Sequence, residues 1–147
     1  MRSDYSLRDG ITMKLETDDW PKKKIDIVLA TIAVVADVGL DKATTAMIAK
    51  GAGAGEGTIY RYFQNKEDLI FTSAIFASGM VFSKPRKNYN PELPIEEQYR
   101  RFCCDFLSGG GNVRVYHIFL EQFIDSPAGI EYRRNTLENL EQDPDIR

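Results

Sequence analysis

Four glycines at alternate positions constrain this 147-residue chain more than any other feature. They are Gly51, Gly53, Gly55 and Gly57. Because glycine destabilises a helix interior and readily adopts positive φ angles, this stretch halts any helix and favours a tight turn. The residues before it, Ala46 to Ala52, and those after it, Thr58 to Phe63, have helical character. Two short helices joined by a glycine-bearing turn are what a helix-turn-helix requires, because its second helix must reach into the major groove of DNA.

The remaining sequence also predicts helices. Apolar residues from Lys22 to Val38 follow helical spacing, and Gly39 is placed to end that helix as a left-handed residue. Thr44 and Asn65 are expected to cap the helices that follow them, the second of which continues to about residue 82. Residues 84–94 are expected to form a proline-rich linker. Three further helices are expected at 95–107, at 113–124 and from Ser126-Pro127 to roughly Leu140. Strand alternation extends over a few residues at most, so the sequence predicts an all-α fold.

These elements divide the chain into three parts. Residues 1–21 show no periodicity and are interpreted as an N-terminal arm. Residues 22–72 are interpreted as one domain that contains the helix-turn-helix, with a connecting helix that runs on to about residue 82. Residues 83–147 form a second helical domain.

Charge is distributed unevenly along the chain. The formal net charge is −3, which taken alone argues against a nucleic-acid partner. Residues 20–66, however, carry seven basic and four acidic residues, a net of +3, between two acidic segments. This basic segment coincides with the predicted helix-turn-helix, although ordinary variation along a solvated surface would give a similar pattern.

Composition argues against several classes of protein. No apolar run approaches the length of a membrane span and the N-terminus lacks a signal pattern, so a cytoplasmic protein with no membrane partner is expected. One histidine and two adjacent cysteines, Cys103 and Cys104, provide neither a multi-histidine metal site nor a disulfide framework. The sequence shows no nucleophile–base–acid constellation and no phosphate-binding loop. We therefore expect no metal, no cofactor and no enzymatic activity.

The second helix of the predicted motif has two distinct faces. Ile59 and Phe63 are four residues apart and can pack back onto Ile48 of the first helix. Thr58 and Tyr62 share another face, whose hydroxyl groups can hydrogen-bond phosphate oxygens and base edges. The alternative interpretation is the solvated polar face of a purely structural helix.

Two residues beside this helix are further candidates for phosphate contact. Lys66 lies at the N-terminus of the following helix, where free N–H groups and the positive end of the dipole attract phosphate. Thr45 lies at the start of the first motif helix and can contact a phosphate in the same way.

Over roughly residues 22–72, about a third of the chain, the sequence closely resembles the TetR family of bacterial transcriptional regulators. The resemblance rests on Val38-Gly39, Thr44-Thr45 and the stretches 48–53, 57–63 and 65–69, whose combined spacing is specific. It implies a three-helix DNA-binding head, a larger helical body that binds a small ligand and dimerises, and repression that the ligand releases. A homodimer would present two heads to a pseudo-palindromic operator in double-stranded DNA.

The resemblance also implies roles for individual residues. The positions that match the family's phosphate contacts are Thr45, Tyr60, Tyr62 and Lys66. The positions that match residues facing base edges are Glu56, Gly57, Thr58 and Tyr60. Lys22, Lys23 and Lys24 lie where the arm before the first helix often touches the DNA backbone or minor groove.

The sequence departs from the family pattern in three respects. Ala54-Gly55 replaces a branched apolar residue followed by serine, which makes the turn more flexible. Glu56 replaces a residue that is often basic or an amide, and its carboxylate can accept from cytosine N4 but repels phosphates. Family members also continue into two long C-terminal helices after a segment that resembles residues 119–127. The ligand-binding body, residues 83–147, is therefore interpreted as truncated, which leaves its mode of dimerisation open.

Aromatic residues of the body are candidates for lining a pocket between helices that binds a small apolar or aromatic ligand. They are Tyr99, Phe102, Phe106, Tyr116, Phe119 and Phe123. For any one of them taken singly, ordinary core packing is the favoured interpretation. His117 and the adjacent cysteines could form a Cys–His nucleophilic pair, but no third orienting group accompanies them, so a core thiol beside a polar ring is expected instead. A redox role for Cys103 and Cys104 is left open.

Three classes of function follow from these observations. The leading hypothesis is a DNA-binding transcriptional regulator, a repressor that a small-molecule ligand releases from its operator. The alternative is a regulator-like protein with weakened DNA reading, which acts through protein or ligand binding; Ala54-Gly55-Glu56 and the short C-terminal part motivate it. An enzyme is the least favoured class.

Overall fold

The computed structural model of this chain describes residues 19–108 and 113–142, so most of the predicted N-terminal arm, residues 1–21, lies outside the described residues. Seven helices and no strand occur within these ranges, which confirms the all-α prediction. No helix among them is both long enough and apolar enough to cross a membrane. The helices are α2 Lys22–Val38, α3 Thr45–Gly51, α4 Glu56–Tyr62, α5 Lys66–Lys87, α6 Ile95–Leu107, α7 Val113–Asp125 and α8 Pro127–Gln142.

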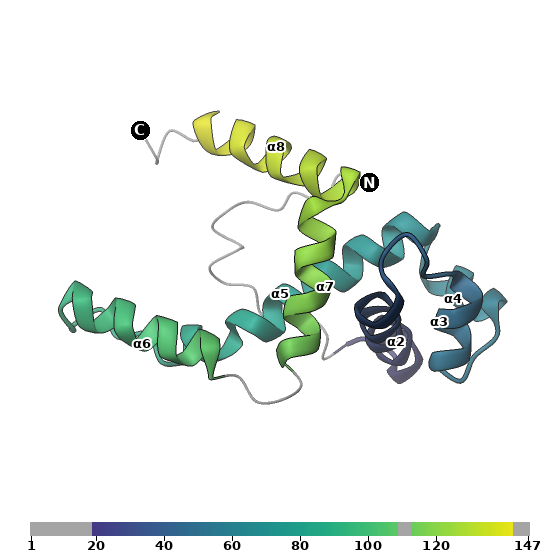
Figure 1. The fold of residues 1–147 in the computed structure, drawn as a ribbon, viewed down its shortest axis with the longest axis horizontal. Helices are drawn as coiled ribbons and strands as arrows, with labels where there is room; N and C mark the ends of the chain where they lie inside the picture. The colour runs from purple at the N-terminus through teal and green to yellow at the C-terminus, as the bar shows by residue number, and fades with distance from the viewer. Residues whose placement is uncertain (1–18, 109–112, 143–147) are drawn as a thin grey trace.

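Helix α5 connects the two ends of the molecule (Figure 1). Helices α2, α3 and α4 gather near its N-terminal end, and we call them, with the first turns of α5, the head. Helix α7 packs across α5 and also against α2, whereas α6 lies along the C-terminal part of α5. Helix α8 continues from α7 and packs on it. The part from the middle of α5 to α8 is called the body below.

One continuous apolar core joins the head to the body. In the head every helix turns its apolar face to a common centre, where the deepest side chains are at most 1% exposed. These side chains are Ile27, Val28, Ile32, Val35, Ile48, Ile59 and Leu69. The core then follows α5 through Ala74 and Ala77 to Phe119 and Phe123 of α7. The head is therefore not an independent unit on a flexible tether, because its core is shared with α7.

The predicted helix ends are confirmed by their capping hydrogen bonds. The Thr44 hydroxyl accepts from the backbone N–H of Met47 at 3.2 Å, and the Asn65 side chain accepts from the N–H of Asp68 at 2.8 Å. Ser126 caps α8 in the same way. Gly39 ends α2 with φ 94° and ψ 154°, so its φ is positive as expected, but its ψ is extended rather than left-handed helical. Glycine is the residue that occupies this region without strain.

Two helices begin or end elsewhere than the sequence predicts. Helix α4 begins at Glu56 rather than Thr58, which places Gly57 inside the helix. Burial of Ile59 and the favourable position of an acidic residue in the first turn offset the poor helix propensity of Gly57. Helix α5 ends at Lys87, so residues 84–87 of the predicted linker are helical instead. Phe82, three residues before the first proline, packs against Phe102 and Phe106 of α6, so α5 has tertiary contacts close to its predicted end.

Gln122 of α7 joins the body to the end of α2. Its side-chain oxygen accepts from the backbone N–H of Leu40 at 2.8 Å, and its side-chain nitrogen donates to the carbonyl of Val35 at 3.3 Å. The Val35 carbonyl also accepts from the N–H of Gly39 at 2.9 Å, whereas Leu40 lies past the end of α2, where backbone groups need partners from outside the helix. One amide side chain therefore satisfies a donor and an acceptor of the head from more than 80 residues away in sequence.

Replacing Gln122 with the similarly sized leucine is expected to lower the free energy of unfolding by about 1–3 kcal/mol. The physical reason is that the partly buried N–H of Leu40 loses its partner. Chemical denaturation followed by circular dichroism measures the change. Glu121→Leu, at the exposed neighbouring position, should alter stability by no more than about 0.5 kcal/mol. Equal effects of the two substitutions would contradict the assignment.

Candidate nucleic-acid interface

Helices α3 and α4 form the two-helix motif that the glycine series predicts. Helix α3 ends at Gly51, and the turn that follows is closed by two backbone hydrogen bonds, from Gly53 to Lys50 and from Ala54 to Ala49. Gly53 has a φ of 60°, in the left-handed region that favours glycine. Helix α4 then starts from the extended residue Gly55. This turn fixes the direction in which α4 leaves α3.

The two predicted faces of α4 are present. Ile59 and Phe63 are 1% and 3% exposed and belong to the same core as Ile48, which confirms that they pack back onto α3. Tyr60, by contrast, is 54% exposed. Tyr62 is half-buried, with its ring packed against the core. The apolar face therefore anchors α4 and leaves Tyr60 on its outer side.

The backbone of α4 is unusually accessible at its first turn. A Cβ atom added to Gly55 or Gly57 would meet no other heavy atom within 4 Å. Packing therefore does not require glycine at either position, and Gly57 keeps the outer side of α4 flat beside the exposed side chain of Glu56. Such a surface permits close approach of a binding partner to the helix backbone.

Thr45 and Glu56 are brought together by the turn. The Thr45 hydroxyl donates a hydrogen bond of 2.7 Å to Oε2 of Glu56, and the two residues are the first of α3 and of α4. A bond from a hydroxyl to a carboxylate is stronger than a bond between neutral groups. The family resemblance implies two different contacts for these residues, and nothing in their sequence positions indicates that they bind each other.

The three lysines at the start of α2 each have a partner within the head. Lys22 forms an ion pair of 3.1 Å with Asp26, and Lys23 lies 3.4 Å from the carbonyl oxygens of Ala52 and Gly53 in the turn. Lys24 lies over the ring of Trp20, 4.1 Å from its centroid. These lysines belong to a helix rather than to an arm, and Lys23 places a positive charge at the helix-turn-helix.

Lys66, half-buried, is the first residue of α5, and its position is held by the residues around it. Asn65 caps the helix, and the Asp68 carboxylate accepts from the backbone N–H of Gln64 at 2.9 Å. This reciprocal arrangement fixes the chain between α4 and α5. Lys66 therefore follows α4 in a defined position.

The six aromatic candidates for a ligand pocket differ in their surroundings. Tyr116, Phe119 and Phe123 are at most 9% exposed and form part of the main core. Tyr99 and Phe102 are 69% and 42% exposed on α6, where Phe102 stacks on Phe82 and Phe106. The sequence analysis placed them together because it could not tell which face of each helix meets α5.

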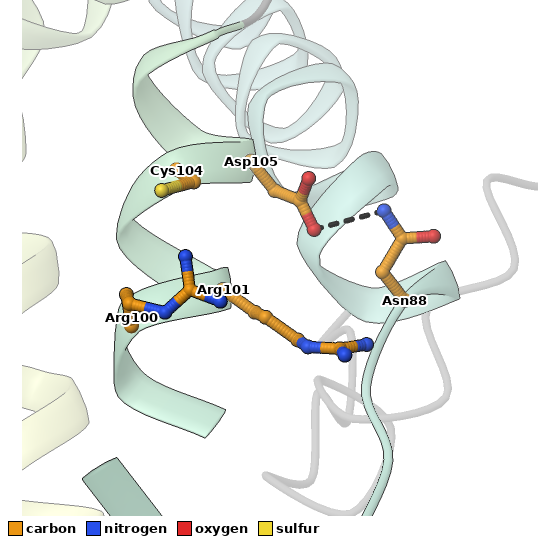
Figure 2. A pocket seen from close by; sticks show the side chains of 5 residues that line it. All are labelled: Asn88, Arg100, Arg101, Cys104 and Asp105. Atoms are coloured by element: carbon orange, nitrogen blue, oxygen red, sulfur yellow. Dashed lines mark hydrogen bonds between the residues drawn. The ribbon is translucent and has the colours of Figure 1, made fainter. Parts of the chain in front are cut away.

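A polar hollow of about 320 Å³ lies beside α6, and none of those core aromatics lines it. Figure 2 shows the side chains that do. It is lined by Asn88, Arg100, Arg101, Cys104 and Asp105. Asn88 donates to Asp105 at 2.8 Å, and both arginines bond Glu97, whose pKa these hydrogen bonds lower to about 2. This hollow could not be predicted from the sequence, because Asn88 belongs to the proline-rich segment, whose pattern indicates only a linker.

The cysteine and histidine candidates have separate surroundings. His117 packs edge-on against Phe106, with ring centroids 4.7 Å apart, whereas the Cys104 thiol lies at the polar hollow. Both cysteines are free. Among the residues that the structure describes, no group of three potential metal ligands is found.

Comparison with known proteins gives one family and several related structures. Residues 27–72 match the model of the bacterial regulatory proteins of the tetR family. The fatty acid metabolism regulator protein of Bacillus subtilis is 42% identical over 76 residues, which are 52% of this chain and 39% of that protein. An uncharacterised HTH-type transcriptional regulator of Haemophilus influenzae is 35% identical over 51% of this chain and 40% of its own length. The chain thus matches about two fifths of the length of these relatives.

Solved structures extend the similarity beyond the head. A TetR family transcription regulator from Marinobacter aquaeolei superposes with a TM-score of 0.68 and 25% identity, over 90% of this chain and 70% of that one. A TetR-family transcriptional regulator from Haemophilus influenzae gives a TM-score of 0.67 and 26% identity, over 77% and 62% of the two chains. The proteins named here are regulators and not enzymes, as the sequence analysis expected for this chain.

Gly57→Ala is expected to change stability and DNA binding in opposite directions. Alanine in α4 should raise the free energy of unfolding by about 0.5–1 kcal/mol, because the new methyl group meets open space. If α4 enters a major groove, the same methyl group stands between the helix backbone and the bases, and binding to a duplex should weaken by about tenfold, or about 1.4 kcal/mol. Thermal unfolding and fluorescence anisotropy measure the two effects.

Gly129→Ala is the contrasting substitution. A Cβ at Gly129 would lie 1.9 Å from the carbonyl oxygen of Phe123, so this variant should be destabilised. Unchanged duplex binding by a stable Gly57→Ala variant would show that Gly57 does not approach the bases.

Proposed function

We propose that this chain, which belongs to the tetR family of bacterial regulatory proteins through its residues 27–72, binds operator DNA as a transcriptional repressor that a small ligand releases. The main support for the proposal is that the outer side of the helix-turn-helix is exposed and open. There Tyr60 is exposed, Gly55 and Gly57 leave the first turn of α4 open, and Lys66 follows at the start of α5. A helix held from behind by Ile59 and Phe63 and open in front can enter a major groove.

The residues divide into two groups by the chemistry they offer. Tyr60, Tyr62 and Lys66 provide hydroxyl and ammonium donors for phosphate oxygens, which set the register of a protein on the duplex. Gly57 and Thr58, on the first turn of α4, face base edges together with Glu56. Because one head covers one half-site, a homodimer would read a pseudo-palindromic operator. Because bacterial operators lie in the cytoplasm, we propose that location for this protein.

Release by a ligand follows from the way the body holds the head. Exposed aromatic rings of α5 and α6, Phe82 and Phe102, with Phe106 and His117 beside them, offer an apolar surface to a small apolar or aromatic molecule. A molecule that moved α7 relative to α5 would also move Gln122, which holds the end of α2. The buried rings Tyr116, Phe119 and Phe123 would then act through core packing rather than through direct contact.

Salt dependence of DNA binding tests the proposed contacts. Lys66→Ala should weaken binding to every duplex and reduce the slope of log K against log salt by about one unit, because one phosphate contact is lost. Tyr62→Phe removes only the hydroxyl and keeps the packed ring, so binding should weaken by about three- to tenfold. Fluorescence anisotropy with a duplex selected from a random pool gives both values.

Arg133→Ala supplies the control, because Arg133 is exposed on α8 in the body and is not one of the proposed contacts. Its binding curve and its salt slope should match those of the unmodified protein. If the unmodified protein selects no duplex at any salt concentration, or if both head variants bind unchanged, the proposed function is wrong.

A further inference from the structure

The hydrogen bond between Thr45 and Glu56 has a consequence for how the head reads DNA. A threonine hydroxyl has a single hydrogen to donate, and here it is donated to Oε2 of Glu56. Phosphate oxygens are acceptors, so this hydroxyl cannot donate to a phosphate while the bond to Glu56 holds. The carboxylate, in turn, is fixed at the start of α4 with its second oxygen, Oε1, left with lone pairs for another donor.

From this geometry we infer that Glu56 is a specificity-determining residue that accepts a hydrogen bond from the N4 amino group of a cytosine, and that Thr45 positions it. The inference rests on the proposed function, since it requires α4 to lie in the major groove. It assigns Thr45 a role different from the phosphate contact that the family resemblance implies.

The chemistry of the major groove selects cytosine among the four bases. A carboxylate is an acceptor only, and guanine and thymine present acceptors at this edge, so both repel it. Adenine presents its N6 amino group beside the acceptor N7, so the carboxylate would be attracted by the amino group and repelled by N7. Cytosine presents the amino group without an acceptor of its own at this edge. Glu56 therefore discriminates by repulsion as well as by attraction.

The surroundings of Glu56 fit this role. Gly55 and Gly57 flank it without side chains, and no atom lies within 4 Å of where their Cβ atoms would be, so the helix backbone can come close to the base edge. A negative charge there also repels the DNA backbone, which lowers affinity for unrelated sequences. The same carboxylate thus reduces general binding and favours one base.

The hydrogen bond to Thr45 makes this discrimination effective. An exposed glutamate without a partner can rotate away from an unfavourable base at the cost of a rotamer change alone. With Oε2 held at 2.7 Å by a residue of α3, such a rotation also breaks a charge-assisted hydrogen bond. Thr45 is itself half-buried at the start of a helix whose next turns belong to the core, so the anchor is fixed.

The experiment compares base preference among matched variants of the full chain. The unmodified protein first selects a duplex from a random pool. The affinity of each variant is then measured for this selected duplex and for three versions of it in which the preferred cytosine is replaced by each of the other bases. An unrelated duplex measures general affinity. The variants are Glu56→Gln, Thr45→Val and Thr45→Ser. Glu56 is exposed, so its replacement leaves the core intact, and thermal unfolding confirms that each variant is folded.

The inference predicts a distinct pattern for each variant. Glu56→Gln should lose its preference for cytosine by between about fivefold and about a hundredfold, accept adenine, and bind the unrelated duplex more tightly. Thr45→Val should lose part of the same preference while its affinity for the unrelated duplex stays unchanged. Thr45→Ser keeps the hydroxyl and should retain the preference of the unmodified protein.

Two outcomes would overturn the inference and leave the proposed function intact. If Glu56→Gln binds all duplexes more tightly by the same factor, Glu56 only repels phosphates. If Thr45→Val weakens binding to all duplexes by the same factor, including the unrelated one, Thr45 is a phosphate contact. Failure of the unmodified protein to select any sequence would instead overturn the proposed function, and this inference with it.

Discussion

The arrangement of this protein depends on one helix that has to bury its apolar side against two different sets of neighbours. Near its start α5 packs Leu69 and Ile70 into the head, and further along it packs Ala74 and Ala77 beneath α7. Small side chains on that part of α5 allow α7 to come close enough to reach α2 as well. The start of α5 is held by the Asn65 cap and by the burial of Leu69 and Ile70 in the head, whereas α7 joins the middle of this helix to α2.

Features that depend on neighbouring residues could be predicted from the sequence. The caps formed by Thr44, Asn65 and Ser126 involve side chains and N–H groups three residues apart, so residue type and spacing determine them. The inward packing of Ile59 and Phe63 follows in the same way from helical periodicity. These local rules were enough for the all-α fold and for the helix-turn-helix, because both are built from consecutive elements.

Contacts between distant residues could not be predicted. Gln122 meets the end of α2 only because α7 packs across α5, and nothing in the residues around it indicates that partner. The bond from Thr45 to Glu56 depends on the direction in which the glycine turn sends α4 away from α3. The aromatic residues of α6 and α7 are similar in type, and only the packing of each helix on α5 separates the exposed Tyr99 from the buried Phe119.

The charge of the head shows why a count of residues is a poor guide to an electrostatic surface. Of its basic residues, Lys23 is placed against carbonyl groups of the turn and Lys24 against Trp20, where their charges stabilise the head itself. Lys22 pairs with Asp26, but this ion pair is exposed and weak, so a phosphate can readily replace the carboxylate. Glu56 then places a negative charge on the side of α4 that faces outward. The net charge of +3 on residues 20–66 therefore overstates the positive charge that these three lysines and Glu56 leave for a partner.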